Sequence, residues 1–170
     1  KNVADGIRVT PLSTGPLGGE TLVNTTTSNV QSITSNVAQA IAADASGNYV
    51  VVWGSNAQDG DLYGIFAQRF NADGVPQGTE FQINSTTTDQ QLTPTVAMDR
   101  TGNFVVTWMS NLQDGDSYGI YAQRYNAAGV AQGSEFLVNS TTVNAQTSPA
   151  VAMAANGSFI INWTSSGQDP

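Results

Sequence analysis

The chain has 170 residues, of which 39% are hydrophobic, and its thirteen acidic and five basic residues give a net charge of −8. No run approaches the roughly eighteen apolar residues of a membrane-spanning helix, so the sequence predicts a soluble chain with no membrane span and enough length for a core. The acidic charge excludes nucleic acid as a partner, and the absence of cysteine and histidine excludes disulfides, thiolate metal sites and histidine-based catalysis.

The dominant feature of the sequence is a tandem repeat. Trp53, Trp108 and Trp163 follow one another at intervals of 55 residues (108 − 53 and 163 − 108). The string Gln-Asp-Gly-Asp at 58–61 recurs at 113–116. Repeats of this length bury their apolar faces against their neighbours. We therefore expect function to be repeated rather than concentrated at one active site.

The predicted elements are short strands. The chain opens with two of them, 6–9 and 20–24, which align with the third and fourth strands of the later copies. The clearest complete copy has strands at 95–99, 104–109, 120–125 and 135–139, separated by glycine-bearing turns. The last copy supplies a first and a second strand at 150–154 and 159–164.

These elements predict an all-β chain, because no segment combines a helical apolar period with helix caps. Four antiparallel strands per copy match one blade of a β-propeller. The predicted divisions are a half blade with a linker at 1–39, complete blades at 40–94 and 95–149, and a half blade at 150–170. Propellers close with about four to eight blades, and this chain has three blade-equivalents, open at both ends. We expect copies of the chain to join as a homo-oligomer or polymer through their complementary half-blades.

The residue pattern of the repeat resembles that of a known family. The unit reads Gln-Asp-Gly-Asp-x-Tyr-Gly-Ile, followed by Gly-x-Glu-Phe, and it resembles repeats in large secreted bacterial and cyanobacterial proteins of the haemolysin-type (RTX), cadherin-like, calcium-associated group. This resemblance implies a secreted or cell-surface protein. The Gly-Gly-x-Gly-x-Asp nonapeptides of that group are missing, so their calcium dependence does not carry over.

Candidate ligand residues lie where the loops after the second and fourth strands meet at one end of the blades. They are aromatic or amide side chains: Trp53, Gln58, Tyr63, Trp108, Gln113, Tyr118 and Trp163. Aromatic rings beside amides suit stacking on sugar rings. A tryptophan once per blade is also typical of a buried wedge between blades, and both interpretations stay open.

The charged residues of the repeat also have two interpretations. Asp59, Asp61, Asp114 and Asp116 provide the oxygen ligands that Ca²⁺ prefers, or they cap the backbone of a hairpin turn. Arg69 and Arg124 lie in the third strands, and we expect them to pair with Glu80 and Glu135 or to stack between aromatic rings.

A glycosidase needs two carboxylates at one asymmetric site, whereas the acidic residues here repeat with the blades, so the sequence predicts that the chain is not an enzyme. We expect a secreted, non-enzymatic binding or adhesion module that recognises glycan multivalently. The alternative is a structural protein whose half-blades join chains into a fibre or surface matrix.

Overall fold

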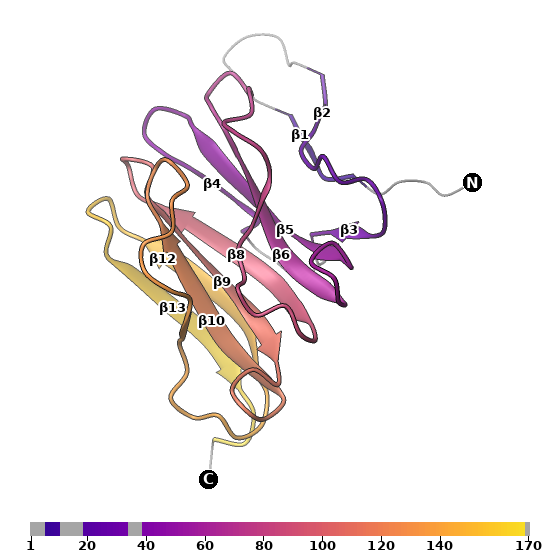
Figure 1. Cartoon of the computed structure of the whole chain (residues 1–170). Coiled ribbons are helices and arrows are strands. Elements are labelled where there is room, and N and C mark those ends of the chain that lie inside the picture. Colours follow the sequence, from indigo (N-terminus) through magenta and orange to yellow (C-terminus); the bar gives the residue numbers. More distant parts are fainter. Residues whose placement is uncertain (1–5, 11–18, 34–38, 169–170) are drawn as a thin grey trace.

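The computed structural model describes residues 6–10, 19–33 and 39–168, and these residues form strands, turns and loops with no helix (Figure 1). Every strand pair within them is antiparallel. The prediction of an all-β, antiparallel fold is confirmed. The described residues include no helix long and apolar enough to cross a membrane.

The strands form four successive sheets, two of them complete and two of them single pairs. The first pair is β1 (Arg8–Val9) with β2 (Thr21–Leu22). The second sheet contains β3 (Gln31–Ser32), β4 (Ile41–Ala43), β5 (Tyr49–Asn56), β6 (Tyr63–Phe70) and β7 (Phe81–Gln82), with β3 and β4 both pairing with β5. The third sheet contains β8 (Gln91–Met98), β9 (Phe104–Asn111), β10 (Tyr118–Tyr125) and β11 (Phe136–Leu137). The last pair is β12 (Gln146–Met153) with β13 (Phe159–Ser165).

The first strands of the third and last sheets begin earlier than the sequence predicts. β8 starts at Gln91 rather than at residue 95, and β12 starts at Gln146 rather than at residue 150. In both strands the pairing register shifts around a proline, Pro94 or Pro149, which lies directly before the residue where the sequence predicts the strand to begin. A bulge accommodates a residue without an N–H inside a strand, so the strand continues through the proline.

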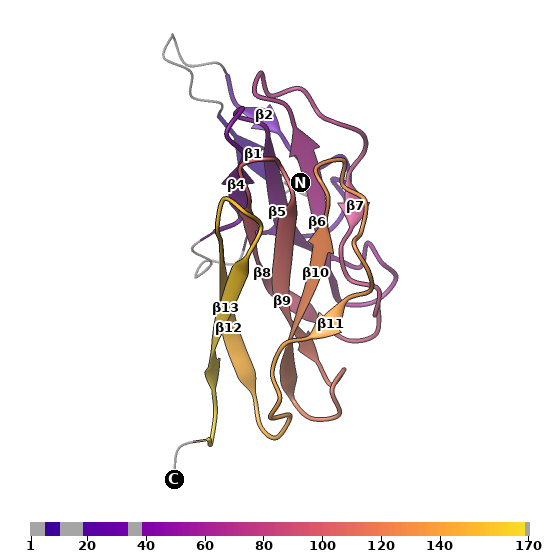
Figure 2. The same cartoon turned by 90° about the vertical axis from the view of Figure 1, so that its left-hand side faces the viewer.

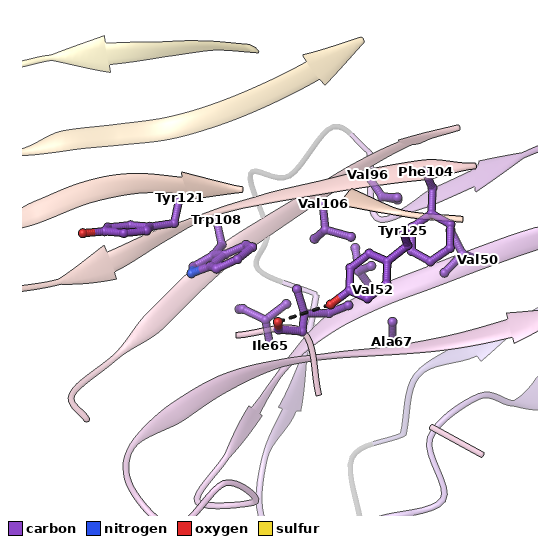
Figure 3. Packing of buried hydrophobic residues seen from close by; sticks show 11 residues of the cluster. Val50, Val52, Ile65, Ala67, Val96, Phe104, Val106, Trp108, Tyr121 and Tyr125 are labelled. Carbon is purple, nitrogen blue, oxygen red and sulfur yellow. Dashed lines mark hydrogen bonds between the residues drawn. The ribbon is translucent and has the colours of Figure 1, made fainter. Parts of the chain in front are cut away.

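Neighbouring sheets pack face to face on an apolar layer. Between the second and third sheets, Val50 and Val52 of β5 meet Val106 and Trp108 of β9, all of them without exposed surface (Figure 3). Burial on both faces explains why these strands are rich in β-branched and aromatic residues rather than alternating with polar ones. Tyr125 also lies in this layer, and its hydroxyl donates to the Ile83 carbonyl at 3.3 Å.

The two strand pairs lie at opposite ends of the stack (Figures 1 and 2). Ile7 and Val23 of the first pair cover one face of the second sheet, around Trp53. Val151 of the last pair covers the far face of the third sheet, around Val105. The fourth strands β7 and β11 lie on the same side of the stack (Figure 2).

Candidate functional site

The tryptophans of the two complete sheets are buried wedges. Trp53 and Trp108 have no exposed surface, and each packs in the apolar layer toward the preceding sheet. The Trp53 indole N–H donates to Gln31 at 3.0 Å, and the half-buried Trp163 donates to Gln146 at 3.2 Å. A ring without exposed surface presents no face to a sugar. The prediction that Trp53 and Trp108 stack on a ligand is corrected accordingly.

The predicted amide residues join neighbouring sheets through a glutamate at the start of the fourth strand. Gln58 donates to Glu80 at 2.7 Å, and the other donors come from the preceding sheet. They are the Thr25 backbone N–H and the Thr26 hydroxyl, both at 2.6 Å, and the Thr26 backbone N–H at 3.4 Å. In the next copy the equivalent carboxylate is that of Glu135. It accepts from three donors: Gln113 at 2.7 Å, the Ser85 N–H at 2.6 Å and the Thr86 hydroxyl at 3.1 Å. We call this arrangement the glutamate clamp.

The hydrogen bonds of this clamp lower the pKa of Glu80. Burial raises the pKa of Glu80, but the hydrogen bonds from Thr26, Thr25 and Gln58 outweigh burial and hold that pKa below its ordinary value. The arginines take no part in the clamp, so they do not pair with Glu80 and Glu135, which was one of their two sequence interpretations. Arg69 instead donates to the carbonyl of Ala128 in the third sheet, and Arg124 donates to Gln132 of its own sheet at 3.3 Å.

The paired aspartates hold the loops together. Asp59 accepts from the Asn84 amide at 3.3 Å, and Asp61 accepts from the Asp89 backbone N–H at 2.8 Å. Asp114 and Asp116 make the equivalent contacts with Asn139 at 3.2 Å and the Asn144 N–H at 2.9 Å. No three carboxylates gather within the described residues in the way a metal ion requires. This geometry favours the turn interpretation of the four aspartates.

One of the predicted aromatic residues lines a hollow. Tyr63 is half-buried at the start of β6, and it borders a cavity of about 190 Å³ between the second and third sheets. The other lining residues are Ser32, Gly54, Leu92, Thr93 and Pro94. The wall is mostly apolar, and the Thr93 hydroxyl is buried without a hydrogen-bond partner among the described residues. The hollow therefore presents an aromatic ring in a mostly apolar wall, with the buried Thr93 hydroxyl behind its surface.

The hollow lies where the repeat is broken. Gly54 of β5 stands where the third sheet has Met109 and the last pair has Thr164. Met109 fills the corresponding space, and its sulfur lies 3.5 Å from the Ser148 backbone nitrogen of β12. Gly54 is the residue that sequence reasoning missed. The sequence does contain a signal for this position, because a glycine stands where the next copy has a large apolar side chain.

Comparisons with known proteins place the fold. No family model and no curated protein matches the chain. A solved structure, the endo-arabinase from Bacteroides thetaiotaomicron VPI-5482, is similar with a TM-score of 0.52 and 16% sequence identity. The match covers 96% of this chain and 62% of the endo-arabinase chain, so the chain spans less than two thirds of that structure. At this identity the likeness concerns the fold alone.

This likeness corrects the functional prediction. Because the acidic residues repeat with the sheets, the sequence predicts a non-enzymatic module. That prediction is wrong, because a solved structure of similar fold is an enzyme. Regular sheets can carry an asymmetric site where single positions depart from the repeat, and Gly54 shows that this chain contains such a departure. The expectation of a non-enzymatic adhesion protein and its structural alternative are both withdrawn.

Proposed function

We propose that the chain is a run of β-propeller blades that binds carbohydrate, with one sugar ring held in the hollow at Tyr63. The observation that carries the proposal is the hollow itself, an aromatic-lined cavity with a mostly apolar wall. Small-molecule sites are concave and mostly apolar, with few placed polar groups. The endo-arabinase likeness supports a carbohydrate as the ligand class.

The size of the hollow limits what it accepts. Its volume of about 190 Å³ is below the range of roughly 300–1,000 Å³ that is typical of sites for whole drug-sized ligands. One pentose or hexose ring is a better match for this space than an oligosaccharide. The Tyr63 ring offers an apolar face to the C–H groups of such a ring.

Secretion is part of the same proposal. Lys1 is the only lysine in the chain, and the polar residues are mainly threonine, serine, asparagine and glutamine. This composition suits an extracellular protein, where polysaccharide is available as a ligand.

The decisive experiment compares two tyrosines that occupy equivalent positions. Tyr63→Ala should weaken polysaccharide binding about tenfold, because an aromatic contact contributes on the order of 1 kcal/mol. Tyr118→Ala is the matched control and should bind as the parent does, since Met109 fills the space beside it. Binding is measured by calorimetry on polysaccharides, with arabinan among them, and release of reducing sugar shows whether hydrolysis accompanies binding.

A second variant tests the hollow without removing the aromatic ring. A side chain at Gly54 would begin 3.6 Å from the Ser32 carbonyl oxygen and from a Tyr63 ring carbon, both ordinary contact distances. Gly54→Met should therefore fold normally, fill the hollow and abolish binding. The proposal fails if no polysaccharide binds the parent, or if the Tyr63 and Tyr118 variants behave alike.

A further inference from the structure

A second cavity lies between the second and third sheets, at the opposite end of β6 from Tyr63. It measures about 200 Å³. All of its lining residues belong to these two sheets or to the turns between their strands, so both walls are formed by complete sheets. Unlike the hollow at Tyr63, this cavity has many polar side chains in its wall, which are Asp44, Asn48, Arg69, Gln77 and Thr101.

Arg69 brings a half-buried positive charge to this cavity. Its Nη1 atom donates to the Ala128 carbonyl across the gap between the sheets. A guanidinium group has five N–H donors, and this is the one that meets a protein acceptor within the described part of the chain. No carboxylate of the described residues forms an ion pair with Arg69. Burial lowers the pKa of Arg69, because leaving water disfavours a charged group.

The backbone of the third sheet holds the Arg69 side chain in place. Gly129 has a φ of 79°, and a Cβ atom built on it would lie 2.9 Å from both Cδ and Nη1 of Arg69. The arginine therefore lies directly against the turn between β10 and β11, in space that any other residue at 129 would occupy. A charged group that is already held in one place loses little side-chain entropy when it binds a ligand.

A carboxylate lines the same cavity without pairing with Arg69. Asp44 accepts from the Ser46 N–H at 2.8 Å, the Asn48 N–H at 2.9 Å and the Asn48 side-chain amide at 2.8 Å. A carboxylate has about four acceptor positions, so Asp44 has capacity for one more donor. The cavity thus presents a cation that lacks an anion and, separately from it, a carboxylate that can accept a further hydrogen bond.

These two groups define what the ligand must carry. An acceptor anion suits Arg69, and a carboxylate matches the fork of a guanidinium best. A hydroxyl donor suits Asp44, and further hydroxyls suit the amides of Asn48 and Gln77. A simple anion would meet the negative charge of Asp44 without offering it a donor. An amine without a carboxylate would be repelled by Arg69. A sugar acid has both a carboxylate and hydroxyl groups.

We propose that this cavity binds a single uronic acid unit, with its carboxylate on Arg69 and a ring hydroxyl on Asp44. The site is separate from the hollow at Tyr63, because the two cavities share no lining residue. The inference therefore does not rest on binding at Tyr63. It adds an acidic sugar to the ligands of the chain.

The first test is calorimetry with glucuronate, glucose and acetate. Glucuronate should bind the parent, and the other two should bind at least about tenfold more weakly, since each lacks one of the two matching groups. Arg69→Gln should weaken glucuronate binding by a similar factor. Arg100→Gln is the matched control, because Arg100 is exposed beside the cavity and does not line it. The proposal is overturned if glucuronate does not bind the parent, if acetate binds equally well, or if the two variants lose binding alike.

A second variant leaves Arg69 and its contact with Ala128 intact. Gln77 is exposed, and its side chain donates only to carbonyls of its own turn, at Val75 and Pro76. Gln77→Glu should therefore fold with the melting temperature of the parent. It should weaken glucuronate binding several-fold, because the new carboxylate repels that of the ligand or competes for Arg69. Unchanged glucuronate binding in this variant contradicts the proposed site.

The same titrations separate this site from the hollow. Tyr63→Ala should bind glucuronate as the parent does, and Arg69→Gln should keep any arabinan binding of the parent. Loss of glucuronate binding in Tyr63→Ala would assign the sugar acid to the hollow and overturn the inference. A parent that binds glucuronate but no neutral polysaccharide would instead support this site and contradict the hollow as a sugar site.

Discussion

A single carboxylate joins the first strand pair to the second sheet, and another joins the second sheet to the third. Glu80 gathers donors from two parts of the chain that are far apart in sequence, Gln58 and Thr25–Thr26. Hydrogen bonds to an ionised acceptor are stronger than those between neutral groups, and they are directional. The clamp therefore fixes how adjacent sheets sit on one another, which the apolar layer alone would not do.

The clamp predicts a loss of stability in acid. Because the folded-state pKa of Glu80 is below its ordinary value of 4.5, the contribution of Glu80 is fully present above that value. It is lost as the pH falls through the lower folded-state pKa. Glu80→Gln should lower the melting temperature at pH 7 and flatten its fall between about pH 5 and pH 3. Melting curves across that range measure both effects.

Asp73→Asn is a suitable control for this experiment, since Asp73 is exposed in the turn between β6 and β7. It should melt with the pH dependence of the parent. An unchanged pH profile in Glu80→Gln would show that the clamp contributes no pH-dependent stability.

At the scale of the element, hydrogen bonds from aspartates stabilise the loops between the second and third strands. Residues 57 and 112 both have positive φ, 58° at Ala57 and 59° at Leu112, a conformation that is uncommon outside glycine. The aspartates hold this shape through their contacts with Asn84, Asn139 and the following loop. Local hydrogen bonds of this kind are sufficient reason for the Asp-Gly-Asp pattern.

If the aspartates only stabilise turns, calcium should not change the melting temperature of the chain. Asp114→Asn with Asp116→Asn keeps one acceptor oxygen at each position, and it should cost about 1–2 kcal/mol of folding free energy. The loss in melting temperature should be equal in calcium and in chelator. A calcium-dependent rise in the parent that the double variant lacks would instead establish a metal site, because a ligand of the native state stabilises it.

At the scale of the whole molecule, two complete sheets lie between two strand pairs in one stack. Apolar layers separate the neighbouring sheets. The glutamate clamp joins the first strand pair to the second sheet and the second sheet to the third.

The sequence by itself determined the repeat, the all-β class and the expected strand pairs, because spacing, β-branched runs and glycine-bearing turns are local properties of the chain. It did not determine which role each repeated residue has. Trp108 is buried, and β8 continues through Pro94. Glu80 accepts hydrogen bonds from the preceding sheet and does not pair with Arg69. These outcomes depend on a neighbouring sheet that contacts each residue from far along the chain. The hollow at Gly54 is the clearest case, since a missing side chain becomes a cavity only when the facing sheet is in place.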